Sequence, residues 1–257
     1  MNGQPPSVEQ RPPLCLLLLE GQRALVEIAS LLPAAPWLRL APQGDGHPVL
    51  VLPGFTAGDE STVALRRYLR RLGYHTHGWR LGRNMGFRGE LWAIERSLTL
   101  RIESLYHRHG RRLSLVGWSL GGIYAREIAR AMPARIRQVI TLGSPFAGRG
   151  YGSNVRGLYE LVTGRRIADH DPKRLERLLE PPPVPSTAIL SRTDGVAHWK
   201  ACRERPAPHT DNIEVLGSHC GLGFNPVVFF AIADRLAQDE NGWRPFARDG
   251  WRSLLYA

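Results

Sequence analysis

The chain has 257 residues, a formal net charge of +11 and 43% apolar residues. A chain of this length buries roughly three quarters of the surface of its unfolded form, so we expect one large domain or one domain with a small insert. The longest apolar run, Leu14 to Leu19, is far shorter than the roughly 20 residues of a membrane-spanning helix, and it lacks the flanks of a secretory signal. With 3 cysteines there is no disulfide framework. The composition therefore excludes transmembrane and disulfide-rich classes and predicts a cytoplasmic protein.

The positive charge comes almost entirely from arginine, since Lys173 and Lys200 are the only lysines. Such a charge attracts anions over long range. However, arginines such as Arg66 and Arg70 alternate with leucines on a predicted helix, which is typical of the exposed face of an amphipathic helix. We therefore favour a solvated surface over a polyanion site. No nucleic-acid-binding motif is present, and we expect no nucleic-acid partner.

From residue 48 onward, short apolar runs alternate with segments of helical periodicity. Strands are expected at 48–52, 74–79, 113–116, 138–142, 187–190 and 213–216. Helices are expected at 16–32, 61–72, 91–105, from 120 onward, at 172–179 and at 226–237. This alternation predicts an α/β fold with a mostly parallel central sheet flanked by helices.

Two details of the helices can be tested directly. The first helix has apolar residues at helical spacing and ends at Pro33, and these are Leu17, Ala24, Leu25, Ile28, Leu31 and Leu32. We expect this helix to pack on the body. For the helix at 61–72, Asp59 or Ser61 is the expected N-cap.

Between about 148 and 185 the alternation stops, because glycines are followed by one short helix and by three consecutive prolines at 181–183. We interpret this segment as a cap above the sheet. The expected organisation is 1–44, a loose segment and a helix packed on the body; 45–147, the first part of the core; 148–186, the cap or lid; and 187–257, the rest of the core with a C-terminal tail. The residues Tyr151, Leu158, Tyr159 and Leu161 fit an apolar acyl site and a small core of the cap equally well.

One segment carries most of the chemical information. Gly117-Trp118-Ser119-Leu120-Gly121 lies between a predicted strand and a predicted helix. A sharp reversal there requires a strained backbone at Ser119, and glycines two residues away on each side remove the steric obstacle. The turn would expose the Ser119 hydroxyl at the start of a helix, where developing negative charge is stabilised. This pattern predicts a nucleophile elbow.

A serine hydroxyl needs a base to accept its proton. In the order serine, aspartate, histidine that is expected after such an elbow, the base follows the last strand. His219 meets this condition. His198 and His209 also lie downstream, but neither directly follows a predicted strand, so we predict His219 as the base.

The third residue must accept the second imidazole proton. Asp194 lies just after the strand at 187–190, at the edge where parallel sheets place their ligands. Asp211 is expected to precede a strand and thus to lie at the wrong edge, while Asp169 and Asp171 lie in the cap. We predict Asp194, which would also fit an ordinary turn before a glycine.

Acyl transfer further requires two donors for the tetrahedral oxyanion. The amide of Leu120, directly after the nucleophile, is one expected donor. The other should come from the loop after the strand at 48–52, where we predict the amide of Phe55, with Thr56 in reserve. A simple strand-ending turn is the alternative explanation of this loop.

With these residues in place, the sequence resembles the α/β-hydrolase fold superfamily, and within it the lipases and esterases. The resemblance covers about residues 45–237 and is most specific at the elbow and at His219. The segment Thr141-Leu142-Gly143-Ser144-Pro145 resembles one that many lipase-like members carry, whereas Pro53-Gly54 departs from the His-Gly of many members.

This resemblance implies hydrolysis of a carboxylic ester through an acyl-serine, with no cofactor and no metal. The expected partner is a small acyl ester, lipids among the candidates. Two alternatives remain open: an acyltransferase with the same triad, and a catalytically inactive protein that binds an acidic partner. The substrate's acyl chain and the oligomeric state are not predicted.

Two pairs of histidines, His75 with His77 and His107 with His109, alternate in a way that metal sites sometimes do. Neither pair has a cysteine or carboxylate at convincing ligand spacing. The second pair ends a predicted helix, where cations complement the helix dipole. We therefore do not predict a metal site.

Overall fold

The computed structural model describes residues 10–86, 91–148, 153–164, 166 and 172–257. Within these residues, six strands form one sheet in the order β2-β1-β3-β4-β5-β6, and each neighbouring pair is parallel. The strands are β1 (Pro48–Leu52), β2 (His75–Gly78), β3 (Leu113–Trp118), β4 (Ile136–Leu142), β5 (Ser186–Leu190) and β6 (Thr210–Glu214). The predicted α/β fold with a mostly parallel central sheet is therefore confirmed.

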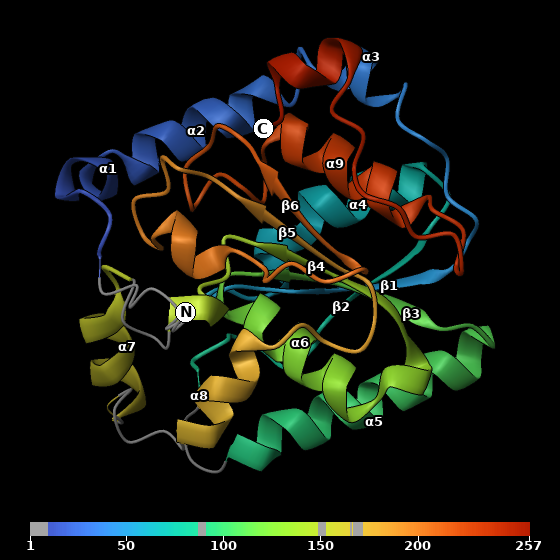
Figure 1. Ribbon diagram of the computed structural model, residues 1–257, viewed down its shortest axis with the longest axis horizontal. Helices are drawn as coiled ribbons and strands as arrows, with labels where there is room; N and C mark the ends of the chain where they lie inside the picture. The colour runs from blue at the N-terminus through green and yellow to red at the C-terminus, as the bar shows by residue number, and fades with distance from the viewer. Residues whose placement is uncertain (1–9, 87–90, 149–152, 165, 167–171) are drawn as a thin grey trace, which may run out of the picture.

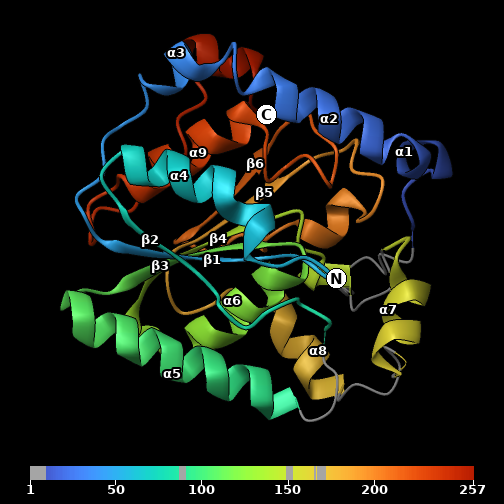
Figure 2. The same cartoon turned by 180° about the vertical axis from the view of Figure 1, so that it is seen from behind.

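Helices cover both faces of this sheet (Figures 1 and 2). The α-helices are α1 (Leu14–Leu18), α2 (Glu20–Ser30), α3 (Ala35–Leu38), α4 (Val63–Arg71), α5 (Leu91–His109), α6 (Leu120–Ala131), α7 (Arg156–Thr163), α8 (Pro172–Leu179) and α9 (Pro226–Leu236). Short 3-10 helices lie at η1 (Asp59–Thr62), η2 (Pro133–Arg135), η3 (Phe146–Gly148), η5 (Trp199–Cys202) and η6 (Gly250–Leu254). In the figures, α2, α3, α4 and α9 lie on one side of the sheet, and α5, α6 and α8 lie on the other.

Because successive residues of a strand point to opposite faces, a sheet covered on both sides needs apolar residues at every position. In β1, Val49 and Val51 belong to the apolar cluster under α4 and α9, whereas Leu50 and Leu52 belong to the cluster under α5 and α6. This explains why β1 is an uninterrupted apolar run.

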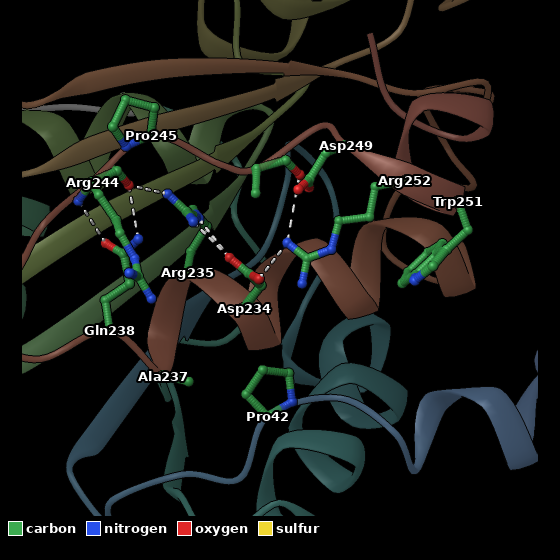
Figure 3. A pocket seen from close by; sticks show the side chains of 12 residues that line it. Pro42, Asp234, Arg235, Ala237, Gln238, Arg244, Pro245, Asp249, Trp251 and Arg252 are labelled. Atoms are coloured by element: carbon green, nitrogen blue, oxygen red, sulfur yellow. Dashed lines mark hydrogen bonds and ion pairs between the residues drawn. The ribbon is translucent and has the colours of Figure 1, made fainter.

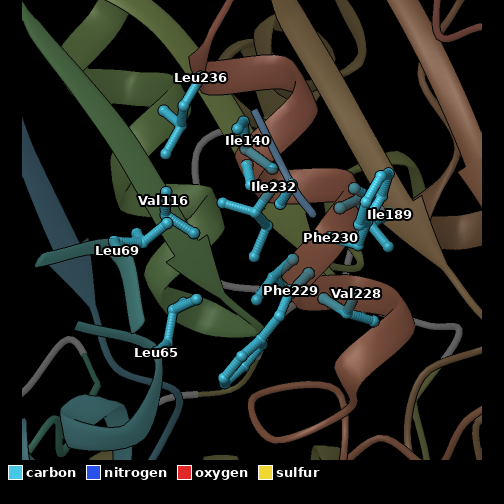
Figure 4. Packing of buried hydrophobic residues seen from close by; sticks show 14 of the residues in the cluster. Leu65, Leu69, Val116, Ile140, Ile189, Val228, Phe229, Phe230, Ile232 and Leu236 are labelled. Carbon is cyan, nitrogen blue, oxygen red and sulfur yellow. The ribbon is translucent and has the colours of Figure 1, made fainter. Parts of the chain in front are cut away.

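Figure 4 shows the cluster on the first face, where Leu65 and Leu69 of α4 meet residues of α9 over the central strands. Val116 of β3 and Phe229 of α9 are among its buried members. Each such side chain stabilises the fold by about 1.5–3 kcal/mol. The core therefore holds the carboxyl ends of the strands rigidly, and those ends carry the loops described below.

The strand order reverses at one point. From β1 the chain moves outward to β2 and then returns to pair β3 with the other side of β1. The loops after β1 and β3 therefore diverge at the carboxyl edge of the sheet, the usual ligand position in open α/β folds.

The first predicted helix is interrupted in the structure. The segment is broken into α1 and α2 at Leu19. Its apolar stripe is divided: Ala24 is buried and Leu31 packs against the core, whereas Leu25 is 66% exposed and Leu32 is 83% exposed. The buried residues of α2 are Glu20 and Ala24. The packed face thus includes a carboxylate, because the loops beneath it present backbone amides that require acceptors.

Three smaller expectations also need correction. Thr62 is the N-cap of α4, and Asp59 accepts hydrogen bonds from the amides of Trp79 and Arg80 instead of capping the helix. The cap segment contains α7 in addition to the predicted α8. The last strand begins at Thr210, so Asp211 lies within β6 rather than before it.

The C-terminal tail packs on the body. Phe246 and Tyr256 are buried, and Ala257 exchanges two backbone hydrogen bonds with Glu214 of β6. Across the described residues, no helix combines the length and the apolar character needed to cross a bilayer.

Candidate active site

Ser119 lies at the turn between β3 and α6, with φ of 52° and ψ of −120°. This left-handed backbone is strained for a residue with a side chain. A Cβ at Gly117 would lie 2.4 Å from the Cα of Gly122, and one at Gly121 would lie 2.5 Å from the carbonyl oxygen of Leu52. Only glycine fits these positions, so the local sequence explains why the turn forms and why the Ser119 side chain projects from it.

A chain of hydrogen bonds connects Ser119 to two residues from distant parts of the sequence. The Ser119 Oγ lies 3.0 Å from Nε2 of His219, and Nδ1 of His219 lies 2.6 Å from Oδ2 of Asp194. A carboxylate can only accept a hydrogen bond, so Nδ1 of His219 carries a proton and donates a hydrogen bond to Asp194. In the neutral imidazole, Nε2 is then the acceptor for the hydroxyl proton of Ser119.

Asp194 is held in place by its own loop. Its Oδ1 accepts hydrogen bonds from the amides of Val196 (2.8 Å) and Ala197 (2.7 Å), which leaves Oδ2 for His219. A Cβ at Gly143 would lie 3.1 Å from both Asp194 Oδ2 and His219 Nδ1. Since Gly143 also has a φ of 54°, the close approach of β4 to this pair depends on glycine.

His219 is buried, and its loop is fixed to the elbow by Trp118, whose Nε1 donates to the His219 carbonyl at 3.1 Å. Burial by itself lowers the pKa of the imidazole. The charge and hydrogen bond of Asp194, together with the charge of Glu20, raise this pKa by more, so the net pKa of His219 lies above its ordinary 6.5.

The loop after β1 lies against the elbow. A Cβ at Gly54 would be 3.4 Å from the Cβ of Ser119. The amide of Thr56 donates to the carbonyl of Asn84 at 2.7 Å, whereas that of Phe55 donates no backbone hydrogen bond within the described residues. Leu120 is the first residue of α6, and such amides have no intrahelical acceptor.

The sequence analysis missed Asn84, which holds the loop after β1 in this conformation. Its side chain is fully buried and donates from Nδ2 to the carbonyl of Pro53 at 2.9 Å, and its backbone exchanges hydrogen bonds with Thr56 and Ala57. Nothing in the local pattern marked it, because it lies in a loop between glycines.

The sequence analysis also missed Glu20 and Glu27 of α2. Glu20 accepts hydrogen bonds from the amides of Gly195 (2.7 Å), His219 (3.0 Å) and Cys220 (2.9 Å). Glu27 accepts from the amide and the hydroxyl of the residue before His219, both at 2.7 Å. Two carboxylates seven residues apart on one helical face were the available signal.

The residues rejected at the sequence level make other contacts. The Nδ1 of His198 accepts from the amide of Lys200 at 3.4 Å, and Nε2 of His209 lies 2.9 Å from the carbonyl of Pro182. Asp211 accepts from the amide of Phe246. Asp169 and Asp171 lie outside the described residues.

The structure groups the histidines differently from the sequence, because His75 and His77 both lie beside His109. Nε2 of His77 lies 3.0 Å from Nε2 of His109, and the ring of His75 is also close to that of His109. Within the described part of the chain, no three histidine, cysteine or acidic side chains are arranged to hold a metal ion. Burial and nearby positive charges, first His109 and then Arg101, lower the pKa of His77 to about 4.

The cap approaches the loop after β1 through one aromatic contact. The rings of Tyr159 of α7 and Phe55 lie 5.4 Å apart. Leu158 is 49% exposed and Leu161 is 80% exposed, so these two leucines do not form a core of the cap. Tyr151 lies outside the described residues.

A cavity of about 670 Å³ lies elsewhere, between the end of α9 and the C-terminal tail (Figure 3). Its charged side chains largely satisfy one another: Arg235 and Arg252 both bind Asp234. The loop of His219 precedes the opposite end of α9, so this cavity is separate from the Ser119 site.

The sheet order, the flanking helices and the elbow at the end of β3 define the class: the chain has the α/β-hydrolase fold. Among solved structures, it is similar to the mature lipase BlEst2 of Bacillus licheniformis, with a TM-score of 0.57, 14% identity and coverage of 77% of this chain and 95% of that one. It is also similar to a monoacylglycerol lipase of Paleococcus ferrophilus, with a TM-score of 0.52, 16% identity and coverage of 77% and 96%. At these identities the similarity establishes the fold.

In sequence, the chain resembles a pimeloyl-[acyl-carrier protein] methyl ester esterase of Aeromonas hydrophila subsp. hydrophila, with 28% identity over 132 residues. The match spans 51% of this chain and 49% of the relative, so it covers about half the length of the curated relative. No family model matches the chain. The chain is thus similar to lipases in fold and, over half of its length, to an esterase in sequence.

Proposed function

We propose that this protein is a serine hydrolase that cleaves carboxylic esters through an acyl-serine intermediate. The observation that supports this most strongly is the hydrogen-bonded chain from Ser119 through His219 to Asp194, which begins at a strained residue in front of a helix. The names of the similar proteins, which include lipases and a methyl ester esterase, agree with an ester as substrate.

In the first half-reaction, Oγ of Ser119 attacks the ester carbonyl carbon while its proton passes to Nε2 of His219. Asp194 accepts the Nδ1 proton in a hydrogen bond and stabilises the imidazolium. The tetrahedral oxyanion accepts hydrogen bonds from the amides of Phe55 and Leu120, and the loss of one such donor costs about 2.7–4 kcal/mol. Collapse of this intermediate breaks the ester bond, and His219 gives its proton to the leaving alcohol.

In the second half-reaction, water attacks the acyl-serine, and Nε2 of His219 takes a proton from that water. The second oxyanion uses the same two amides. Its collapse returns the proton to Oγ of Ser119 and releases the carboxylic acid. No metal or organic cofactor is required at either step.

A fluorophosphonate probe tests the nucleophile directly, because it phosphonylates only an activated serine. We expect the wild-type protein to be labelled at Ser119 and to hydrolyse short nitrophenyl esters. The Ser119→Ala variant should show neither activity while its melting temperature stays nearly unchanged. Labelling or ester turnover that persists in Ser119→Ala would exclude the proposed mechanism.

The test should use a panel of nitrophenyl esters of graded acyl length, since the fold alone does not define the substrate. Matched reactions with an added alcohol distinguish hydrolysis from acyl transfer. A product that is almost entirely free acid supports hydrolysis, whereas a dominant transfer product would replace it with the acyltransferase alternative.

A further inference from the structure

Glu20 of α2 lies where the loops of Asp194 and His219 meet. It is 5% exposed and far from both loops in sequence. Its Oε1 accepts hydrogen bonds from the amides of Gly195, next to Asp194, and of His219 itself, and its Oε2 accepts from the amide of Cys220. One carboxylate therefore joins the loop after β5 to the loop after β6.

These amides belong to loops and have no partner in the sheet. Because a buried N–H group without an acceptor costs free energy, the Glu20 carboxylate stabilises the two loops by accepting their hydrogen bonds. Hydrogen bonds from amides to an ionised carboxylate are also stronger than those to a neutral acceptor. The backbone around Glu20 fits closely, because a Cβ at Gly195 would lie 2.4 Å from the carbonyl carbon of Leu16 in α1. The α1–α2 segment is thus built tightly onto the loop of Asp194.

We propose that Glu20 is a positioning residue that fixes Asp194 and His219 relative to each other, and through them orients His219 toward Ser119. The proposal rests on the function proposed above. Glu20 touches no reacting atom, so its effect passes through the two loops. The helix α2 thereby helps to assemble the site, although it precedes β1 and does not connect two strands of the sheet.

Glu27, about two turns further along the same face of α2, provides a matched comparison. Its Oε1 accepts from the amide and hydroxyl of Ser218, and its Oε2 accepts from Nδ2 of Asn225 at 3.0 Å. None of these contacts reaches the loop of Asp194. Glu27 therefore anchors α2 to one loop only, whereas Glu20 connects two.

The charged groups that act on the His219 ring are Asp194, from the loop after β5, and Glu20, from α2. The negative charge of Glu20 raises the pKa of His219 and stabilises its protonated form. Removal of that charge therefore moves the acid limb of the kcat/KM profile to lower pH.

The experiment compares three variants in the full chain: Glu20→Gln, Glu20→Asp and Glu27→Gln. A glutamine places an amide group against at least one loop donor, so we expect kcat to fall about ten- to a hundredfold with KM within about twofold. The acid limb of Glu20→Gln should lie below that of the wild type. Glu20→Asp keeps the charge but is one methylene shorter, so its kcat should fall while its acid limb stays in place.

Glu27→Gln should retain kcat within about twofold and the wild-type acid limb. The proposal is overturned if Glu20→Gln keeps the wild-type kcat and acid limb, or if Glu27→Gln shows the same loss and the same shift. If Glu20→Gln does not fold, a folded Glu20→Asp with wild-type kcat overturns the proposal by itself.

An NMR titration of the His219 imidazole, assigned with a His219→Gln variant, separates this proposal from the proposed function. The titration needs no turnover, so the pKa of His219 should fall in Glu20→Gln even if the protein hydrolyses none of the esters. Turnover that persists in Ser119→Ala would refute the hydrolase mechanism, whereas an unchanged His219 pKa in Glu20→Gln would refute the role of Glu20.

Discussion

Two sets of aspartate, histidine and serine side chains lie at opposite ends of the sheet. The amino-end set is Asp45, His47 and Ser114, and the carboxyl-end set is Asp194, His219 and Ser119. In the amino-end set, Nδ1 of the histidine lies 2.5 Å from the aspartate and Nε2 lies 2.7 Å from the serine. The corresponding distances in the carboxyl-end set are 2.6 and 3.0 Å. The hydrogen-bond order alone does not distinguish them.

The backbone distinguishes the two serines. Ser114 lies within β3, paired in the sheet with Gln138, and is fully buried. Ser119 lies five residues later, at the strained turn, half-buried and directly before the first amides of α6. A substrate carbonyl can approach only a hydroxyl that projects from the sheet and has oxyanion donors beside it. At the amino end of the sheet, where the serine lies within a strand, the same three residue types form a structural network.

The neighbouring charges differ as well. Nη1 of Arg137 lies 2.7 Å from Asp45 and 3.1 Å from Nδ1 of His47. Burial, and then the charge of Arg137, lower the pKa of His47 to about 4. For His219 the carboxylates of Asp194 and Glu20 outweigh burial, so the pKa is raised. A base that must hold a proton during the reaction benefits from the second environment.

The largest expected effect on kcat comes from replacing His219, with replacement of His47 as the comparison. His219→Gln should lower kcat by about 10⁴-fold or more, because no group then accepts the serine proton. His47→Gln should leave kcat/KM within about threefold. Steady-state kinetics on one nitrophenyl ester, with circular dichroism as the control for folding, measures both. A comparable loss in folded His47→Gln would show that the amino-end set takes part in catalysis.

The next effect concerns stability and pH. His47 has a lowered folded pKa, so between pH 6.5 and about 4 the unfolded chain binds more protons and stability falls as the pH falls. A shift of this size corresponds to about 3 kcal/mol. His219 has a raised pKa, so its contribution has the opposite sign: it is complete below pH 6.5 and is lost as the pH rises through its folded pKa.

Urea unfolding of the wild type and of His47→Gln from pH 7 to pH 4 tests this difference. The free energy of unfolding of His47→Gln should depend less on pH in this range than that of the wild type. Parallel curves for the two proteins would show that His47 does not carry the effect.

The smallest effect is expected for Ser114→Ala. This change leaves Nε2 of His47 buried without its partner, and we expect a loss of about 1–2 kcal/mol in the free energy of unfolding with unchanged kcat/KM. Ser119→Ala is the mirror case, with activity lost and stability retained. Unfolding midpoints and ester turnover, measured together for both variants, give the result. Lost turnover in a folded Ser114→Ala would remove the distinction between the two sets.

Much of the fold was predictable because it depends on local patterns. Strands buried on both faces need continuous apolar runs, and β1 was recognised in this way. The helix α7 was missed because it lies among glycines. The exposure of Leu25 in α2 could not be predicted, since periodicity shows that a face is apolar but not what it will contact.

The candidate site was predictable where position along a strand determines position in space. Ser119, Asp194 and His219 were selected because each follows a strand, and parallel strands end at one edge of the sheet. The structure brings these three side chains together, and their catalytic roles stay predictions until tested. Asn84 and Glu20 follow no such rule, because each acts on loop backbone far away in the sequence.

The sequence by itself determined the parallel α/β architecture and the strained turn at Ser119, because both follow from spacing over a few residues. Only the tertiary structure decided which carboxylates meet which backbone amides and which histidine lies beside an arginine. Those choices depend on the close approach of segments that are distant along the chain, where hydrogen bonding and the local dielectric act on groups that no local pattern relates.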